Sequence, residues 1–447
     1  MNATNITSVH GRRVWDSRGR PTVEAEVTLA GGARGRAIAP AGASTGTGEA
    51  VDLRDGGTAF NGLDVRRAQA NISGDIATAL RGANAADQSA VDRILLALDG
   101  TANKRRLGGN AMIATSMAVA HAAANADRVP LWHYLSNGKP GRLPLPEIQI
   151  FGGGAHAAGR VDVQDFMIMC PRASTFAEAL DITAQVYSMA GKLLGERGLL
   201  QGVADEGGYW PAFASNEEAL DMLLRAIERA GYTPGTEVAI SLDIAASSFG
   251  NNGRYRLALE GRELDSDGLI ELLGRWIARY PIVSVEDPVG EDDAEGFRRF
   301  TKAFGARVQV VGDDFLVTNA ERVRQAAASA AVTTVLIKPN QAGTLTETQA
   351  ALAAARTAGL ATIVSARSGE SENVTIVHLA VGWDAGQLKV GSFARSERMA
   401  KWNEALRIEE ALGVGARFAG GEALAFRRPR VNKRPRVTPP PADGSTA

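Results

Sequence analysis

Five short apolar runs in the second half of the chain constrain the fold most. They are AISLD (239–243), IVSVE (282–286), VQVVGD (308–313), TVLIK (334–338) and TIVSA (362–366). Their last residues lie 43, 27, 25 and 28 positions apart, close to one strand plus one helix each. Ala-rich segments with helical patterns separate them. This alternation predicts a parallel sheet covered by helices, with the spacing of a (β/α)₈ barrel.

The residues on which these runs end indicate chemistry. Four runs end on Asp243, Glu286, Asp313 and Lys338, and the fifth ends on Ala366. Any one charged residue could be the first solvated position of a loop, but four in succession are not explained that way. Because the carboxyl ends of barrel strands meet at one mouth, we expect these side chains to converge.

The three carboxylates, with no Cys or His beside them, predict a Mg²⁺ or Mn²⁺ site, since hard cations prefer oxygen ligands. We expect Lys338 and Lys389 to share the mouth. Each lysine raises the cost of protonating the other, and a bound cation adds to that cost. One lysine is therefore predicted to be neutral near pH 7 and to act as a base.

The N-terminal part has a different pattern. Apolar and polar residues alternate over 22–30, turn at a Gly pair and continue extended over 35–40, and helical patterns follow at 63–82, 86–98 and 109–126. We predict an N-terminal α+β capping domain at 1–138, a barrel at 139–426, and a disordered, basic, Pro-rich tail at 427–447. The tail holds six Arg or Lys residues, and a docking role for it stays open.

Composition narrows the class of partner. With 22% charged residues and a formal net charge of −1, no global field favours nucleic acid or an anionic membrane. The single cysteine, Cys170, excludes an internal disulfide, and the first residues lack the apolar core of a signal peptide. We expect a cytoplasmic protein that acts on a small molecule and contacts neither membrane nor nucleic acid.

The chain resembles the enolase family in colinear blocks that cover about residues 10 to 415. The blocks are DSRGRPTVEAEV (16–27), GASTG (42–46), VDVQDFMI (161–168), ADEGG (204–208), SLDIAAS (241–247), SVEDP (284–288), VGDDFLVTN (311–319), LIKPNQAGTLTET (336–348), SARSGES (365–371) and RSERMAKWNEALRIEEALG (395–413). The resemblance implies an α/β protein with an enolase-type (β/α)₈ barrel and an N-terminal α+β domain. It also implies a Mg²⁺-dependent lyase that interconverts 2-phosphoglycerate and phosphoenolpyruvate plus water, as in glycolysis, and a homodimer or larger even oligomer.

The resemblance also assigns roles to single residues. Asp243, Glu286 and Asp313 would hold one Mg²⁺, and Ser44 would help to bind a second. Lys338 would remove the proton alpha to the substrate carboxylate, Glu206 would protonate the departing hydroxyl, and Lys389 would stabilise the charge that develops. A Lys or His base with one or two Mg²⁺ ions is the known pattern of this superfamily.

The remaining site residues are expected to bind the substrate. Arg367 and Ser368 would grip its phosphate, unless Arg367 pairs with a local carboxylate. His156, Gln164 and Asp165 would close over it, unless His156 is an exposed loop residue.

Three positions depart from the family pattern. Ala366 replaces an active-site His, Asp165 replaces a Glu, and Gly152 replaces an Asn. We expect Ala366 to leave an unfilled space for water or a bulkier substrate group. Three interpretations follow: a divergent hydratase, a paralog acting on a related phosphate or phosphonate, such as carboxyphosphonoenolpyruvate synthase of phosphonate biosynthesis, or a non-catalytic binding protein of the same fold.

Overall fold

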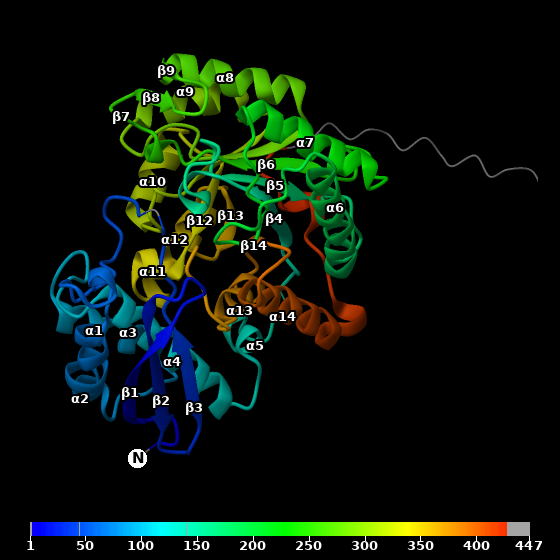
Figure 1. The fold of residues 1–447 in the computed structure, drawn as a ribbon. Coiled ribbons are helices and arrows are strands. Elements are labelled where there is room, and N and C mark those ends of the chain that lie inside the picture. Colours follow the sequence, from blue (N-terminus) through cyan, green and yellow to red (C-terminus); the bar gives the residue numbers. More distant parts are fainter. Residues whose placement is uncertain (1, 44, 140, 427–447) are drawn as a thin grey trace, which may run out of the picture.

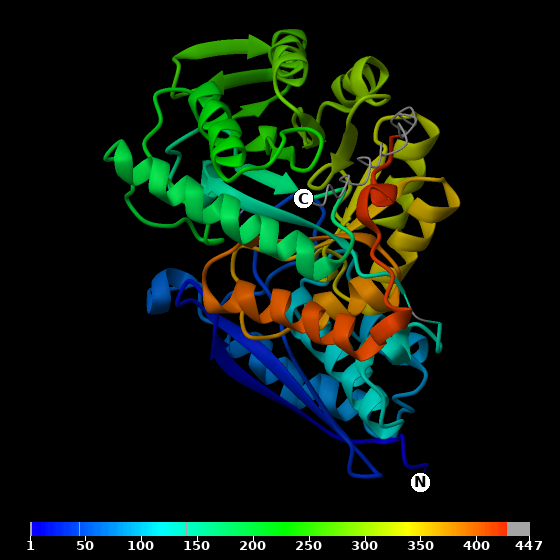
Figure 2. The same ribbon diagram turned by 90° about the vertical axis from the view of Figure 1, so that its right-hand side faces the viewer.

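The computed structural model describes residues 2–43, 45–139 and 141–426. The predicted metal ligand Ser44 and the predicted tail at 427–447 lie outside the described residues. Figure 1 shows an N-terminal domain of one sheet and several helices beside a larger barrel, and Figure 2 shows the same arrangement from the side.

A three-stranded antiparallel sheet opens the chain, in the order β1 (Ile6–Trp15), β2 (Pro21–Leu29) and β3 (Arg34–Ile38). The predicted hairpin corresponds to β2 and β3, and β1 is a third strand that the alternation over 22–40 did not include. Helix α4 (Gly109–Ala126) packs across β2 and β3. A Cβ at Gly35 would lie 2.1 Å from the carbonyl oxygen of Ala118, so this close approach of helix and sheet requires glycine.

The other helices of this domain follow the predicted segments. The segment predicted at 63–82 contains α1 (Arg66–Asn71), a π-helical turn (Ile72–Ile76) and α2 (Ala77–Leu80). Helix α3 (Gln88–Asp99) begins where the Asp87 side chain accepts a hydrogen bond from the Ala90 amide and ends at Gly100, whose φ is 70°. A short helix, α5 (Leu131–Leu135), leads to the barrel.

Eight strands close the barrel, and all five predicted strands are among them. The strands are β4 (Leu145–Gly152), β5 (Asp165–Met169), β6 (Ala239–Asp243), β10 (Ile282–Glu286), β11 (Gln309–Gly312), β12 (Thr334–Ile337), β13 (Ala361–Ser365) and β14 (Gly386–Ser392). The predicted fold class is confirmed.

One strand runs against the expected direction. β5 pairs antiparallel with both β4 and β6, and Asp165 at its start lies opposite Asp243 at the end of β6. The start of β5 therefore lies at the same mouth as the ends of the other strands. Two helices, α6 (Phe176–Glu196) and α7 (Asn216–Arg229), separate β5 from β6.

Helices cover the outside of the barrel, and most begin with a side-chain cap. They are α8 (Ser266–Arg279), α9 (Ala294–Phe304), α10 (Ala320–Ala328), α12 (Leu345–Thr357), α13 (Thr375–Gly382) and α14 (Ser396–Leu412). The short helix α11 (Pro339–Ala342) follows β12 at the mouth, where Gln341 Nε2 donates to Asp313 Oδ1 at 2.9 Å. Asp265, Asp293, Asn319 and Thr344 cap α8, α9, α10 and α12. A small sheet of β7 (Gly250–Asn251), β8 (Arg254–Leu257) and β9 (Arg262–Asp265) extends from the barrel.

The two ends of the barrel are closed differently. At the end opposite the mouth, Ala419, Ala423 and Phe426 pack against β4, β5, β6 and β10. At the mouth, Ala41 of the N-terminal domain bridges to Gly369, which follows β13. The described residues include no helix long and apolar enough to cross a membrane.

Candidate active site

The charged residues at the strand ends converge at the mouth, where all are buried. Lys389 Nζ lies 2.9 Å from Asp243 Oδ2 and 2.9 Å from Glu286 Oε2. Lys338 Nζ contacts the carboxylate of Asp313. The structure therefore brings together five residues that are far apart in sequence, because successive strands of the closed sheet present them at one end.

The surrounding carboxylates favour the charged form of both lysines in this arrangement. Burial lowers the pKa of Lys338, but Asp313 and Glu286 more than offset it, and the pKa lies above its ordinary value. The same balance, dominated by Asp243 and Glu286, raises the pKa of Lys389 well above its ordinary value. The neutral lysine therefore stays a prediction for the site with a bound cation, because the pairing with the carboxylates favours the charged forms. A cation held there would compete with the lysine charges and favour the neutral form.

The carboxylates have the chemistry of a hard-cation site. Glu286 Oε1 is buried and has no hydrogen-bond partner among the described residues. Burial and the neighbouring Asp243 raise the pKa of Glu286 well above its ordinary value, which a cation would reverse. The set of Asp243, Glu286 and Asp313 supplies only oxygen ligands, so it fits a hard divalent ion.

Asp287, the residue after Glu286, holds the backbone at Asp313 and Asp314 in place. Asp287 Oδ1 and Oδ2 accept hydrogen bonds from the backbone amides of Asp313 and Asp314, each at 2.9 Å. Oxygens of Asp287, Asp313 and Asp314 lie within 4.8 Å of one another. Burial, with Asp313 beside it, raises the pKa of Asp314 to about 7.

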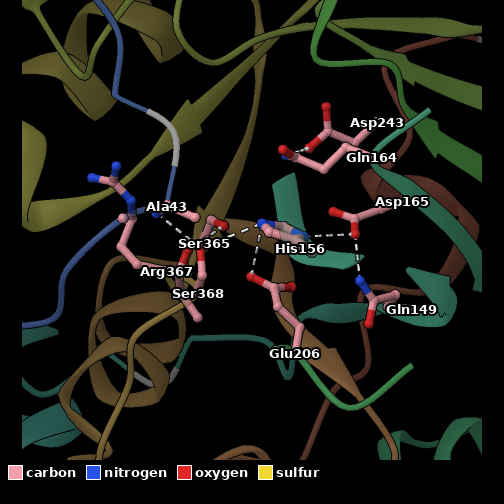
Figure 3. Close-up of polar contacts among 12 residues, drawn as sticks. Ala43, Gln149, His156, Gln164, Asp165, Glu206, Asp243, Ser365, Arg367 and Ser368 are labelled. Carbon is pink, nitrogen blue, oxygen red and sulfur yellow. Dashed lines mark hydrogen bonds and ion pairs between the residues drawn. The ribbon is translucent and has the colours of Figure 1, made fainter. Parts of the chain in front are cut away.

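His156 points into the site and is not an exposed loop residue. It lies on a 3₁₀ turn (Gly154–Ala157), is 6% exposed, and places Nδ1 3.1 Å from Asp165 Oδ1. Its Nε2 lies 3.3 Å from Ser368 Oγ and 3.8 Å from Glu206 Oε1 (Figure 3). Burial lowers the pKa of His156, but Asp165 and Glu206 outweigh burial and raise it to about 9.

Gln164 and Ser368 complete this side of the site. Gln164 Nε2 donates to Asp243 Oδ2 at 3.0 Å, and Ser368 Oγ accepts from the amide of Ala43 at 3.0 Å. Ser368 thereby connects the segment after β13 to the loop that contains the GASTG block.

Arg367 is paired with a local carboxylate, as one of our two interpretations had it. Its Nη1 lies 3.0 Å from Glu49 Oε2 and donates to Asn340 Oδ1 at 3.1 Å. Sequence reasoning missed Glu49, although its position just after the Gly-rich GASTG block was a usable signal. A phosphate at Arg367 would have to share the guanidinium with Glu49 or displace it.

The space beside Ala366 is small. A cavity of about 20 Å³ lies among the site residues, which is roughly room for one water. The lining includes His156, Glu206, Lys338, Ala366, Arg367 and Lys389. Among the described residues, the cavity therefore leaves no room for the expected bulkier group.

Two family models match the chain, one on each side of residues 136–140. The N-terminal domain of enolase matches residues 6–135, and the C-terminal TIM barrel domain of enolase matches residues 141–426. Together with the closed barrel and the mouth just described, these matches define an enolase-type two-domain protein. The chain belongs to the enolase family, a family of lyase-type enzymes. The exact domain boundary at 138 and the roles of the site residues stay predictions.

Proposed function

We propose that this protein is a Mg²⁺-dependent lyase that interconverts 2-phosphoglycerate and phosphoenolpyruvate plus water. One observation carries the proposal: a candidate base, Lys338, and a candidate acid, Glu206, line the same buried cavity beside three carboxylates. Removal of an alpha proton and loss of a beta hydroxyl need these groups together.

The chemistry follows from the side chains. Neutral Lys338 takes the alpha proton through Nζ, and the electron pair of the broken C–H bond moves onto the substrate carboxylate. When the C–O bond breaks, the electron pair forms the new double bond, and the proton of Glu206 goes to the departing hydroxide to give water. Lys389 offsets the additional charge on the carboxylate. A Mg²⁺ held by Asp243, Glu286 and Asp313 would supply further charge stabilisation.

Substrate binding is proposed to use the residues around the cavity. Arg367 and Ser368 would hold the phosphate, with Arg367 exchanging part of its pairing with Glu49 for the phosphate oxygens. His156, Gln164 and Asp165 would cover the substrate, and Ser44 would assist a second Mg²⁺. We also propose a cytoplasmic homodimer or larger even oligomer.

A second candidate is a paralog that acts on a related phosphate or phosphonate, such as carboxyphosphonoenolpyruvate synthase. The observation that favours it is Ala366, a residue without a polar group at the wall of the reacting cavity. The base, acid and metal residues serve either substrate.

The test is turnover by the purified protein. With Mg²⁺ and 2-phosphoglycerate we expect phosphoenolpyruvate, measured by phosphorus NMR, and we expect EDTA to remove the activity. Lys338→Ala should lower the rate at least 10²- to 10⁴-fold, the usual contribution of a general base, whereas Lys192→Ala, an exposed lysine on α6, should not change it. No product from 2-phosphoglycerate, with product from phosphonate analogues of phosphoenolpyruvate, would establish the second candidate.

A further inference from the structure

The three departures from the family pattern surround one histidine. Gly152 ends β4, Asp165 begins β5 and Ala366 follows β13, while His156 lies in the connection between β4 and β5. Gly152 pairs with Asp165 across β4 and β5, and Asp165, His156 and Ala366 line the same cavity.

Gly152 makes room for a glutamine. A Cβ at residue 152 would lie 2.6 Å from Ala204 Cβ and 3.2 Å from Gln149 Nε2. Gln149 is fully buried, and its Oε1 accepts a hydrogen bond from the Gly208 amide at 2.8 Å. That bond fixes the orientation of the amide, so Nε2 is the atom that faces Asp165, and it donates to Asp165 Oδ1.

Asp165, held by Gln149, in turn orients the ring of His156. Its Oδ1 lies 3.1 Å from His156 Nδ1, and a carboxylate acceptor keeps the proton on that nitrogen. The ring then presents Nε2 to Ser368 and Glu206, at the cavity that Ala366 also lines. Figure 3 shows Gln149, Asp165, His156 and Glu206 in this order.

We propose that Gln149 and Asp165 are positioning residues that hold His156 with Nε2 facing the cavity, so that His156 takes over the part of the imidazole missing at position 366. In this role His156 carries a proton on each ring nitrogen, and its Nε2–H donates a hydrogen bond to an anionic oxygen of the substrate or to the departing hydroxyl. The placement of His156 is independent of the reaction; its use in catalysis rests on the proposed function.

The charges around His156 make the placement measurable. Asp165, Glu206 and Asp243 face the ring with negative charge, and Lys389 lies behind Asp165, 3.6 Å from its Oδ2. The chain has five histidines, so imidazole NMR signals are few, and loss of one signal in His156→Gln assigns it. We expect this signal to titrate near pH 9 in the unaltered protein.

The variants separate positioning from general packing. Asp165→Asn should lower the titration midpoint of His156 by more than one pH unit, and Gln149→Met should lower it by a smaller amount. Gln309→Met is the matched control, because Gln309 is also a fully buried barrel glutamine but bonds to Ser284 and Gln387, away from His156. It should leave the midpoint unchanged.

Kinetics give a second readout. In Asp165→Asn and Gln149→Met, kcat should fall more than tenfold with its basic limb moved to lower pH, and Asp165→Glu should retain more activity than Asp165→Asn. A His156 signal that titrates near 6.5 in all variants would overturn the inference. A shift as expected without any turnover would instead refute the proposed function while the placement of His156 stands.

Discussion

At the scale of single residues, the structure changes the meaning of Ala366. Its side chain is 6% exposed, and its amide donates to the carbonyl oxygen of Lys389 at 2.9 Å. The neighbouring cavity holds about one water, and His156 and Ser368 form part of its wall. The position is therefore closed around alanine and does not contain a vacant histidine site.

This packing predicts the outcome of restoring the family residue. In Ala366→His the new ring needs more room than the cavity holds, and overpacking of this kind costs about 1–3 kcal/mol. We expect kcat/KM to fall about tenfold or more, while Ala366→Ser, which adds one oxygen, changes it little. Steady-state kinetics with both variants decide the question. A rise in activity for Ala366→His would show that the site had only lost its histidine and had not been rebuilt around His156.

At the scale of elements, the positions of the strands were more predictable than the strand directions or the side-chain partners. The five predicted strands were found because buried strands are continuous apolar runs with a characteristic spacing. The reversed direction of β5 was not predicted, because an apolar run does not indicate in which direction its strand runs. Gln149 and Glu49 were missed for a different reason: their importance comes from partners, Asp165 and Arg367, that only the folded chain brings near.

A pair of histidines, His378 buried and His121 half-buried, joins α4 of the N-terminal domain to α13 of the barrel. The rings of His121 and His378 lie 6.2 Å apart, His121 Nε2 is 2.8 Å from Thr375 Oγ1, and His378 Nε2 is 3.5 Å from Glu404 Oε1. Burial lowers the pKa of both histidines to about 4, with a further lowering of His121 by His378. The junction is therefore built for neutral imidazoles.

The lowered pKa values of His121 and His378 determine how the stability of the protein changes with pH. Because each folded-state pKa lies below the ordinary 6.5, the unfolded chain binds more protons between pH 6.5 and 4. The contribution to stability is complete above pH 6.5 and is lost as the pH falls towards 4, by about 2 kcal/mol per histidine at pH 5. We expect the denaturation midpoint to fall less between pH 7.5 and 5 in His378→Gln than in the unaltered protein. Equal decreases would contradict this account of the junction.

At the scale of the whole molecule, the last described segment closes the end of the barrel opposite the mouth. Phe426, 8% exposed, packs with Ala419 and Ala423 against Leu145, Met169 and Val283. The chain thus needs residues up to 426 to cover its core.

One truncation and one point substitution test this boundary. Deletion of residues 427–447 should leave the melting temperature and turnover unchanged. Phe426→Ala should destabilise the protein by about 3 kcal/mol, the usual cost of removing a buried aromatic ring. Thermal unfolding of both variants beside the intact chain measures the contrast. A large loss of stability on deletion of 427–447 would place part of the core in the tail, and if only binding to a partner disappears, the tail has a separate docking role.

If Lys338 removes the proton alpha to the substrate carboxylate, that proton exchanges with solvent through the Lys338 side chain. The protein, with Mg²⁺ and 2-phosphoglycerate in D₂O, should incorporate deuterium at the alpha carbon of the remaining substrate, as followed by proton NMR, and Lys338→Ala should not. Deuterium incorporation by Lys338→Ala at the rate of the unaltered protein would contradict the claim.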